Sequence, residues 1–313
     1  MQKLIIKGKR ELSGIISISG SKNATLPILA ALIFCKRAKL KNVPLVQDIF
    51  TMIKLLSFIG LKIKLNKSKR TIELQSDKKK VNTLAPYNLV KTMRAGVLVL
   101  GPMLAKYKKT KISLPGGCAI GTRPVDLHLF ALKKLGAKIK IKNGYIIAEA
   151  KNGLKGSNIR FPNISVGATE NAVLAAFYSK GRSILSNCAI EPEIQDLILF
   201  LNKLGGKILI KGRKIFVDGV KKIKKKIAHD VIFDRIELGT YLIAAALVGN
   251  QIRLNKINPK IVRNEIKILK KMGVKLKVEK NSIIVFKSNK IKNLSVSTKP
   301  YPGFPTDLQA QLM

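Results

Sequence analysis

Apolar and polar positions follow one pattern that recurs four times along the chain. Each copy opens with a helical period that ends in a glycine and continues as a strand in which lysine alternates with an aliphatic residue. The four glycines lie 76, 69 and 68 residues apart: Gly60, Gly136, Gly205 and Gly273. Glycine directly after a helix is a common cap, because it adopts positive φ without strain. Each copy therefore predicts a helix, its cap and a β-hairpin.

A second kind of helix, apolar and rich in small residues, precedes each of these segments. Together with the strands, the two helices and the hairpin form a βαβαββ unit of about 70 residues. The predicted fold class is therefore α/β, and several units must pack together to bury the apolar helices. The expected apolar helices cover residues 23–34, 94–105, 169–178 and 237–248, and a fifth begins at 306.

The end of the chain falls inside the fifth unit. Leu312 and Met313 leave a helix of about two turns, which is too short to be stable alone. Neither a glycine cap nor a proline stop follows. We therefore expect a C-terminally truncated chain. The charge-rich segment 220–227 is expected to link a first domain of three units, residues 22–229, to a partial second domain, residues 230–313.

The net charge of +43, from 60 basic and 17 acidic residues, is extreme. Such a balance often indicates nucleic-acid binding. The lysines, however, are spread along the whole chain, and aromatic residues, which would stack on bases, make up only 5%. We therefore expect a solvated basic surface that attracts anionic substrates, without a specific nucleic-acid partner.

Length and cysteine content indicate a globular protein of a reducing compartment. The 313 residues are enough for two domains, and 46% of them are apolar. No apolar run approaches the 18 or more residues of a membrane span, so no membrane partner is expected. Three widely spaced cysteines and two distant histidines match no disulfide or metal pattern. The expected localisation is cytoplasmic, and no metal site is expected.

The segment from Leu114 to Pro124 is the strongest candidate for chemistry. It holds one thiol, Cys118, among three glycines, and a guanidinium at Arg123. A nearby cation and exposure are what make a cysteine reactive. Arginine suits carboxylate and phosphate groups. We interpret the segment as a loop that presents a thiol to an anionic substrate.

Polar residues also gather where the apolar helices begin. Helix N-termini bind anions through free N–H groups and the helix dipole. Ser21 and Thr306 are placed to cap such starts, and Asp307 would favour the dipole in a first turn. Lys22 and Arg94 do not fit ordinary capping, because a cation at a helix N-terminus is unfavourable unless an anion is present. These starts therefore predict a site for a multiply anionic substrate.

Several motifs, in order along the whole chain, resemble those of the UDP-N-acetylglucosamine 1-carboxyvinyltransferases, a branch of the enolpyruvyl transferase family. The cysteine loop with its following Arg-Pro-Val-Asp-Leu is the most specific of them, and the related shikimate-pathway enzymes lack it. The other matching segments are 19–24, 85–95, 165–169, 234–237 and 304–311. The resemblance implies two domains, each an inside-out α/β barrel of three repeats. It also implies that residues 1–21 belong to the second domain, through a strand at Leu4, Ile5 and Ile6.

The resemblance further implies a reaction and a role for several residues. Family members transfer enolpyruvyl from phosphoenolpyruvate to the 3′-hydroxyl of UDP-N-acetylglucosamine and release phosphate. This is the first committed step of peptidoglycan synthesis, and it needs no metal or organic cofactor. By position, Cys118 matches the acid that protonates the methylene carbon and can form a covalent adduct. Asp307 matches the group that takes or positions the proton of the sugar hydroxyl, and Lys22 and Arg123 match cations around the phosphate and carboxylate.

The same resemblance implies further substrate contacts, chiefly with the nucleotide sugar. The matching residues are Asn23, Arg94, Arg123, Pro124, Val125, Asp126, Leu127, Asn163, Ile164, Ser165 and Val166. Asn163 departs from the family, in which lysine is common, and this change is expected to weaken a diphosphate contact. Two alternatives stay open. One is a truncated chain that binds the nucleotide sugar without turnover, since further arginines belong to the segment expected to be missing. The other is the shikimate-pathway enzyme, which Cys118 argues against.

Overall fold

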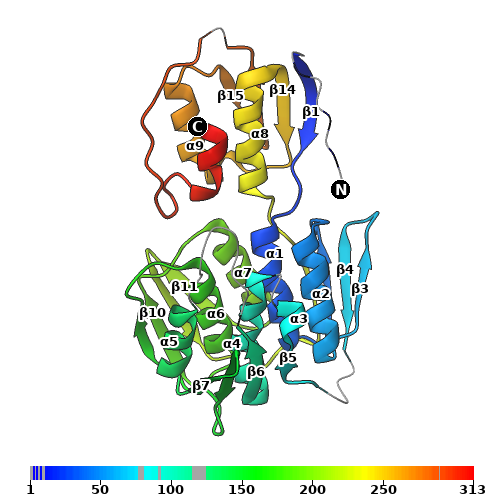
Figure 1. Ribbon diagram of the computed structural model, residues 1–313, viewed down its shortest axis with the longest axis vertical. Coiled ribbons are helices and arrows are strands. Elements are labelled where there is room, and N and C mark those ends of the chain that lie inside the picture. Colours follow the sequence, from blue (N-terminus) through cyan, green and yellow to red (C-terminus); the bar gives the residue numbers. More distant parts are fainter. Residues whose placement is uncertain are drawn as a thin grey trace. The chain divides into compact units, whose positions relative to one another are not determined.

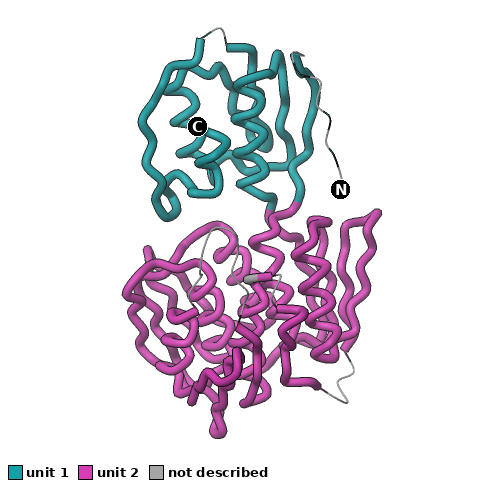
Figure 2. The backbone as a smooth tube through the Cα atoms, in the orientation of Figure 1, with its two compact units in different colours: residues 1–19, 233–313 teal, residues 20–232 magenta. Residues whose placement is uncertain are grey.

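The computed structural model describes the chain except residues 1, 2, 4, 6, 7, 9, 10, 77–80, 91, 92, 115–124 and 289, and at Arg94 it describes only the backbone. The chain divides into two compact units (Figure 2). Unit 1 consists of residues 1–19 and 233–313, and unit 2 consists of residues 20–232. The N-terminal segment is thus grouped with the C-terminal part of the chain.

Copies of one α/β repeat make up unit 2 (Figure 1). The first contains α1 (Lys22–Ala31), η1 (Leu32–Phe34), β2 (Arg37–Lys41), α2 (Gln47–Ile59), β3 (Ile63–Asn66) and β4 (Thr71–Gln75). The second contains β5 (Leu84–Ala85), α3 (Tyr87–Val90), η2 (Arg94–Val99), α4 (Leu100–Tyr107), β6 (Lys109–Ser113), α5 (Asp126–Lys134), β7 (Lys138–Lys142) and β8 (Tyr145–Glu149). The third contains β9 (Asn158–Arg160), α6 (Val166–Phe177), β10 (Arg182–Ser186), α7 (Pro192–Lys203), β11 (Lys207–Lys211) and β12 (Lys214–Asp218).

Each repeat forms one mixed four-stranded sheet with the same order. In the third sheet, β9 runs parallel to β10, which pairs antiparallel with the β11–β12 hairpin through β12. The second sheet uses β5, β6, β8 and β7 in the same way. In the first sheet the parallel partner of β2 is β13 (Lys226–Asp230), which follows the third repeat. This strand ties the end of unit 2 back to its beginning.

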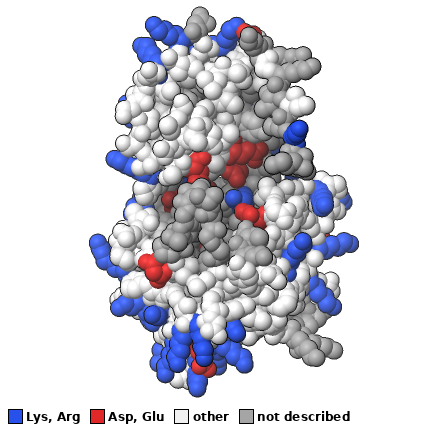
Figure 3. Space-filling model, viewed as in Figure 1, with Lys and Arg blue, Asp and Glu red and all other residues white. Residues whose placement is uncertain are grey.

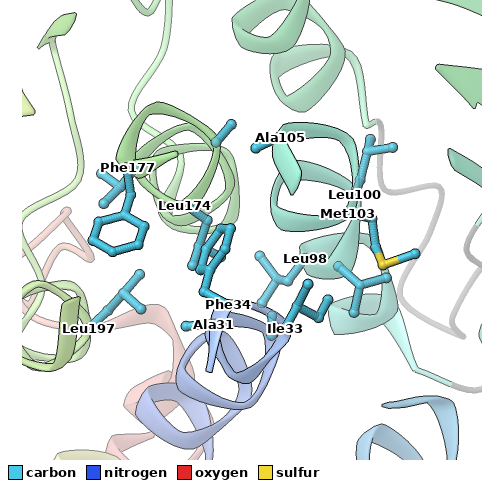
Figure 4. Close-up of a cluster of buried hydrophobic side chains, with 14 of the residues drawn as sticks. Ala31, Ile33, Phe34, Leu98, Leu100, Met103, Ala105, Leu174, Phe177 and Leu197 are labelled. Atoms are coloured by element: carbon cyan, nitrogen blue, oxygen red, sulfur yellow. The ribbon is translucent and has the colours of Figure 1, made fainter. Parts of the chain in front are cut away.

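The apolar helices α1, α4 and α6 lie in the core of unit 2 (Figure 4). Every residue of 24–31, 100–105 and 168–177 is buried. Phe34 packs against Phe177 with ring centroids 5.1 Å apart. Small residues allow this close packing: a Cβ at Gly101 would lie 2.3 Å from Oδ1 of Asn171. Apolar helices inside and sheets that expose one face outside are the inside-out α/β arrangement.

The predicted caps and hairpins are confirmed. The four glycines that follow the outer helices have φ between 90° and 119°: Gly60, Gly136, Gly205 and Gly273. The turn between β7 and β8 has positive φ at Asn143 (51°) and Gly144 (73°), as a type I′ turn requires. The helix expected at 94–105 differs, because it begins as the 3-10 turn η2 and becomes α-helical only at Leu100. Gly and β-branched Val in the sequence Gly96-Val97-Leu98-Val99 have low helix propensity, which is consistent with that start.

Unit 1 contains a further copy of the repeat. Its sheet has the order β1-β14-β16-β15, with β1 parallel to β14. The strand expected at residues 4–6 is not the one in this sheet: β1 covers residues 12–17, and Ile5 is exposed. Leu4 and Ile6 lie outside the described residues. The elements of unit 1 are β1 (Leu12–Ser17), α8 (Arg235–Val248), β14 (Gly249–Asn255), η3 (Pro259–Val262), α9 (Arg263–Lys271), β15 (Leu276–Val278), β16 (Ser282–Phe286), η4 (Thr306–Leu308) and α10 (Gln309–Leu312).

Basic side chains occur on the surface of both units (Figure 3). Along β7, for instance, Lys138, Lys140 and Lys142 are all exposed. Within the part of the chain that the structure describes, no helix is long and apolar enough to cross a membrane.

Candidate functional site

The start of α1 holds the first candidate residues. Ser21 caps the helix as expected, and its hydroxyl oxygen accepts a hydrogen bond from the backbone N–H of Ala24 at 3.2 Å. Lys22, the first helical residue, forms an ion pair with Asp48 of α2, with 3.3 Å between Nζ and Oδ2. The two side chains are 43% and 37% exposed, so the ammonium remains accessible. The carboxylate of Asp48 thus offsets the charge of Lys22 at the helix N-terminus, and Asn23 beside Lys22 is half-buried.

The start of α6 repeats this construction. The hydroxyl oxygen of Ser165 accepts a hydrogen bond from Ala168 N at 3.3 Å. Thr169 donates its hydroxyl proton to the carbonyl oxygen of Ser165 at 2.7 Å, as Thr25 does to Ser21 at 2.6 Å. Val166 takes the place of Lys22, so this start carries a cap without a cation. Just before it, Asn163 is exposed and Ile164 is half-buried.

The first turn of α5 lies against the first turn of α6. A Cβ at Gly167 would lie 3.2 Å from Cε1 of His128, so a larger residue there would have to push the imidazole by a few tenths of an ångström. His128 is buried, whereas Asp126 is exposed and Leu127 is half-buried. The contact thus joins the residues that directly follow two expected nucleotide-sugar segments from different repeats, since His128 follows the segment 123–127 and Gly167 follows the segment 163–166.

Asn171 of α6 joins these two helices to the start of the second apolar helix. Its amide nitrogen donates to the carbonyl oxygen of Val97 at 3.0 Å and lies 3.0 Å from Nδ1 of His128. Its Oδ1 accepts a hydrogen bond from the backbone N–H of Gly101 at 2.7 Å. Because the amide nitrogen can only donate, Nδ1 of His128 is the acceptor, which places a proton on Nε2 of the neutral ring. Arg94 begins η2 one turn before Val97, so the backbone of this candidate lies near the same junction.

Three buried carboxyl groups lie close together between α6 and the start of α7: Glu170, Glu191 and Glu193. Glu170 of α6 is buried, and its burial raises the pKa of the carboxyl well above its ordinary value, with smaller contributions from Glu193 and Glu191. Glu191 and Glu193 lie at the start of α7 and are also buried. This arrangement favours the protonated form of Glu170 over the charged form, compared with an exposed glutamate.

Asp307 belongs to unit 1, where the turn η4 holds it at the surface. The flanking residues Phe304 and Leu308 are buried, while Asp307 is exposed. Leu308 packs on α8 at Gly239, where an added Cβ would lie 2.3 Å from Cδ1 of the leucine. Asp307 lies in the first turn, as expected. The expectation that Thr306 caps this turn was wrong, since Thr306 is already inside it and the capping position is Pro305, which has no side-chain hydroxyl.

The most specific sequence motif lies outside the described residues. Cys118, Arg123 and Pro124 fall in the segment 115–124, and for Arg94 no side chain is described. The other two cysteines, Cys35 and Cys188, are buried. Burial raises the pKa of the Cys188 thiol to about 12, although a hydrogen bond with Thr169 and the charge of Arg213 act in the opposite direction. A neutral, buried thiol reacts slowly with electrophiles.

Sequence reasoning missed Asp48, His128 and Asn171 as parts of this region. Asp48 is separated from Lys22 by a whole strand and loop, and no local pattern connects the two residues. Asn171 carries a visible signal, because it is a polar residue directly before the apolar segment Ala172–Phe177. Buried polar side chains are almost always hydrogen-bonded, so such a residue marks a junction between elements.

Comparisons with known proteins agree with this architecture. The family model for EPSP synthase (3-phosphoshikimate 1-carboxyvinyltransferase) matches residues 6–313. A UDP-N-acetylglucosamine 1-carboxyvinyltransferase of Pelagibacter ubique is 55% identical over the entire chain, which spans 75% of that relative. A protein of the same name from Rickettsia prowazekii is 45% identical, again over all of this chain and 75% of the relative. The chain therefore belongs to the enolpyruvyl transferase family, in the branch of the UDP-N-acetylglucosamine 1-carboxyvinyltransferases.

Solved structures support the fold. The enolpyruvyl transferase NikO from Streptomyces tendae superposes with a TM-score of 0.83, covering 97% of this chain and 72% of that chain at 18% identity. An EPSP synthase from Acinetobacter baumannii superposes with a TM-score of 0.70, covering 98% and 70% at 17% identity. The two-domain inside-out α/β fold is thus shared with these enolpyruvyl transferases.

Proposed function

We propose that this protein transfers the enolpyruvyl group of phosphoenolpyruvate to the 3′-hydroxyl of UDP-N-acetylglucosamine in the cytoplasm. The hydroxyl oxygen adds to C2 of phosphoenolpyruvate while C3 receives a proton. Loss of phosphate and of one C3 proton then restores the double bond. Both substrates are anions, which suits a chain of net charge +43 with capped helix starts that accept negative charge.

The observation that carries this proposal is the identity of 55% over the whole chain to a relative of that name. The EPSP synthase structure that shares the fold is only 17% identical. The sequence also retains the Gly-Gly-Cys loop with Arg-Pro-Val-Asp-Leu, which distinguishes the two branches. A shikimate-type acceptor is therefore the weaker candidate.

The proposed roles follow the sequence positions. Cys118 protonates C3, and Asp307 takes or positions the proton of the acceptor hydroxyl. Lys22 and Arg123 hold the phosphate and carboxylate of phosphoenolpyruvate and stabilise the charge that develops as phosphate leaves. The adjacent segments 125–127 and 163–166, together with Asn23 and Arg94, bind the nucleotide sugar. The close contact of His128 with Gly167 supports the last assignment, because it holds the two segments in one place.

The test measures phosphate release from phosphoenolpyruvate by the full 313-residue chain, with and without UDP-N-acetylglucosamine. Release that needs the nucleotide sugar and is lost in Cys118→Ser is the expected result. Release that instead needs shikimate 3-phosphate would contradict the acceptor. Saturable binding of the nucleotide sugar with no release from a folded chain would contradict turnover and identify a binding protein.

A thiol-labelling experiment tests the role of Cys118 separately. Cys35 and Cys188 are buried, so an alkylating reagent should modify Cys118 first in the folded chain. Phosphoenolpyruvate together with the nucleotide sugar should slow that reaction. Equal labelling rates for the three cysteines in a folded chain would be evidence against a reactive Cys118.

A further inference from the structure

The outer face of the third sheet carries three cross-strand rows of side chains. The register pairs Lys207 with Asp218 and Asp218 with Arg182 at one end of the sheet. The middle row consists of the apolar residues Leu209, Phe216 and Ile184 and ends in the polar residue Asn158. The last row consists of Lys211, Lys214, Ser186 and Arg160. Since successive rows are two residues apart along each strand, all three face the same side.

The first of these rows contains a carboxylate, Asp218, between the two cations Lys207 and Arg182. Arg182 forms a two-pronged ion pair with Asp218, at 2.6 Å from Nε to Oδ1 and 3.0 Å from Nη2 to Oδ2. Two other sheets also contain lysines that pair with carboxylates. On the first sheet, for example, Lys39 pairs with Glu73 at 2.8 Å and Lys41 with Asp230 at 3.8 Å.

The last row is not compensated among the residues that the structure describes. Lys211 and Lys214 stand directly opposite each other, which is unfavourable for like charges. Neither they nor Arg160 forms an ion pair within the described part of the chain. Because the strand pairing holds Lys211 and Lys214 close together with no carboxylate between them, an anion bound from solution would reduce their repulsion.

A hollow of about 290 Å³ lies at this row. It is lined by Arg160, Ser186, Asn187, Lys211, Arg213 and Lys214, so it contains four cations, two neutral hydrogen-bonding groups and no carboxylate. Two of these side chains are held in place. Nη1 of Arg213 donates a hydrogen bond to the carbonyl oxygen of Cys188 at 3.1 Å. The side-chain amide of Asn187 donates to the carbonyl oxygen of Phe161 at 2.8 Å. Fixed donors lose little freedom when a ligand binds.

The apolar row adds a second kind of contact next to the hollow. A neighbouring depression of about 500 Å³ includes Leu209 and Phe216 and shares Lys211 with the basic hollow. Leu209 is 54% exposed, and Phe216 is half-buried. Adjacent rows on one face lie about 7 Å apart along the strands, which is within the reach of a small organic phosphate.

We propose that the outer face of the third sheet binds a phosphomonoester whose organic part is apolar or aromatic. The phosphoryl group occupies the hollow between Lys211, Lys214 and Arg160, with Arg213 as a guanidinium donor. The organic part covers Phe216 and Leu209. The site belongs entirely to the third sheet of unit 2 and its turns, and none of its lining residues is a candidate for the transferase reaction.

Calorimetric titration with phenyl phosphate, at near-physiological ionic strength, tests the site. The titrations use the full chain with Lys22→Met, so that phosphate binding at the transferase site is weakened. We expect Lys214→Gln to weaken phenyl phosphate binding by about fivefold or more, as expected for loss of a charge-assisted contact. Lys207→Gln is the matched control, since it removes the same charge from the row of the same sheet that contains the carboxylate of Asp218, and we expect little change.

Two further measurements separate the contributions. Phe216→Ala should weaken binding of phenyl phosphate but not of inorganic phosphate, because only the former reaches the apolar row. Hydrogen exchange should slow at residues 211–214 of the unsubstituted chain when phenyl phosphate is added. Equal losses in Lys214→Gln and Lys207→Gln would show an effect of overall charge and overturn the proposal. No binding of phenyl phosphate, or binding of a single-stranded oligonucleotide alone, would overturn it as well.

Discussion

The starts of α1 and α6 occupy the same position in the first and third repeats, and they differ in one respect. Both have a serine cap that accepts a hydrogen bond from the residue three positions later, and both have a threonine that bonds back to the serine carbonyl. After the cap, α1 continues with Lys22 and α6 with Val166. The repeat thus supplies a stable helix end with free N–H groups, and the next residue decides whether the end also carries charge.

The residues around the two helix starts also differ in charge and exposure. Lys22 has the carboxylate of Asp48 beside it, at the surface of the unit. The buried Glu170 follows Val166 by one turn and lies near Glu191 and Glu193. An ammonium that remains accessible suits a small, highly charged anion. A start with an apolar first residue suits a larger ligand held by shape and by neutral hydrogen bonds.

The largest expected effect is on catalysis and comes from removing Lys22, the cation that the start of α1 has and the start of α6 lacks. Lys22→Met should lower kcat for enolpyruvyl transfer by about 10²–10³-fold, since it removes the cation that we propose stabilises the charge developing as phosphate leaves. The stability of the protein should change little, because the Lys22–Asp48 pair is largely exposed. Steady-state phosphate release and a urea titration measure the two quantities.

Lys39→Met is the matched control for that experiment. Lys39 is also an ion-paired lysine in the first repeat, with its partner Glu73 at 2.8 Å and a side chain 48% exposed. It lies on β2, away from any helix start. Similar losses of activity in both variants would indicate an effect of net charge and would remove the distinction between the two starts.

Asn171→Ala should destabilise unit 2 by about 2–3 kcal/mol, because it leaves the buried groups of Val97 and Gly101 without their partner. Asn202→Ala serves for comparison, since Asn202 makes two backbone bonds to Ile208 in a half-buried position, and about 1 kcal/mol is expected there. Chemical denaturation followed by circular dichroism gives both values. A smaller loss at Asn171 than at Asn202 would contradict a central role for this junction.

Glu170→Gln should stabilise the protein at neutral pH by about 1–2 kcal/mol, because it removes the cost of burying an ionisable carboxyl. The raised pKa of Glu170 determines how this gain in stability depends on pH. Above the ordinary pKa of 4.5 the unfolded chain loses the proton that the folded chain retains, so stability falls as pH rises. The gain in the melting temperature should therefore be present at pH 7.5 and largely absent near pH 4.5.

Glu73→Gln gives the opposite sign and serves as the control for Glu170→Gln. Its hydrogen bond and ion pair with Lys39 lower the pKa of Glu73, so its contribution is present above the ordinary pKa and is lost as pH falls through the folded value. The variant should lose a little stability at pH 7.5. A gain in Glu170→Gln that is the same at both pH values would contradict the proposed burial cost.

The smallest expected effect comes from the serine N-cap, which the starts of α1 and α6 share. Ser21→Ala and Ser165→Ala should each cost about 1 kcal/mol, the usual value of a lost N-cap. The corresponding threonine variants should retain most of that stability, because a hydroxyl remains at the cap. Urea midpoints measure these changes. A clear difference between the two alanine variants would show that the repeated cap is not equivalent at the two starts.

Much of the repeat could be predicted because its signals are local. A glycine with positive φ ends each outer helix, and Asn143-Gly144 fixes the β7–β8 hairpin, since only a few residues adopt those backbone conformations. The same holds for the Ser21 cap, whose partner is three residues away. The start of the helix at Arg94 and the capping of η4 were less predictable, because several turn conformations compete for such short segments.

The sequence by itself determined the βαβαββ repeats, their caps and turns, and the helix starts where charge and serine residues gather. Only the tertiary structure decided which strands complete each sheet: β13 returns to β2, and β1 pairs with β14. It also decided that Asp48 faces Lys22 and that Asn171 joins three elements. The physical reason is the range of the interactions. Backbone conformation depends on neighbours along the chain, whereas strand partners and buried hydrogen bonds depend on which distant surfaces bury the most apolar area together.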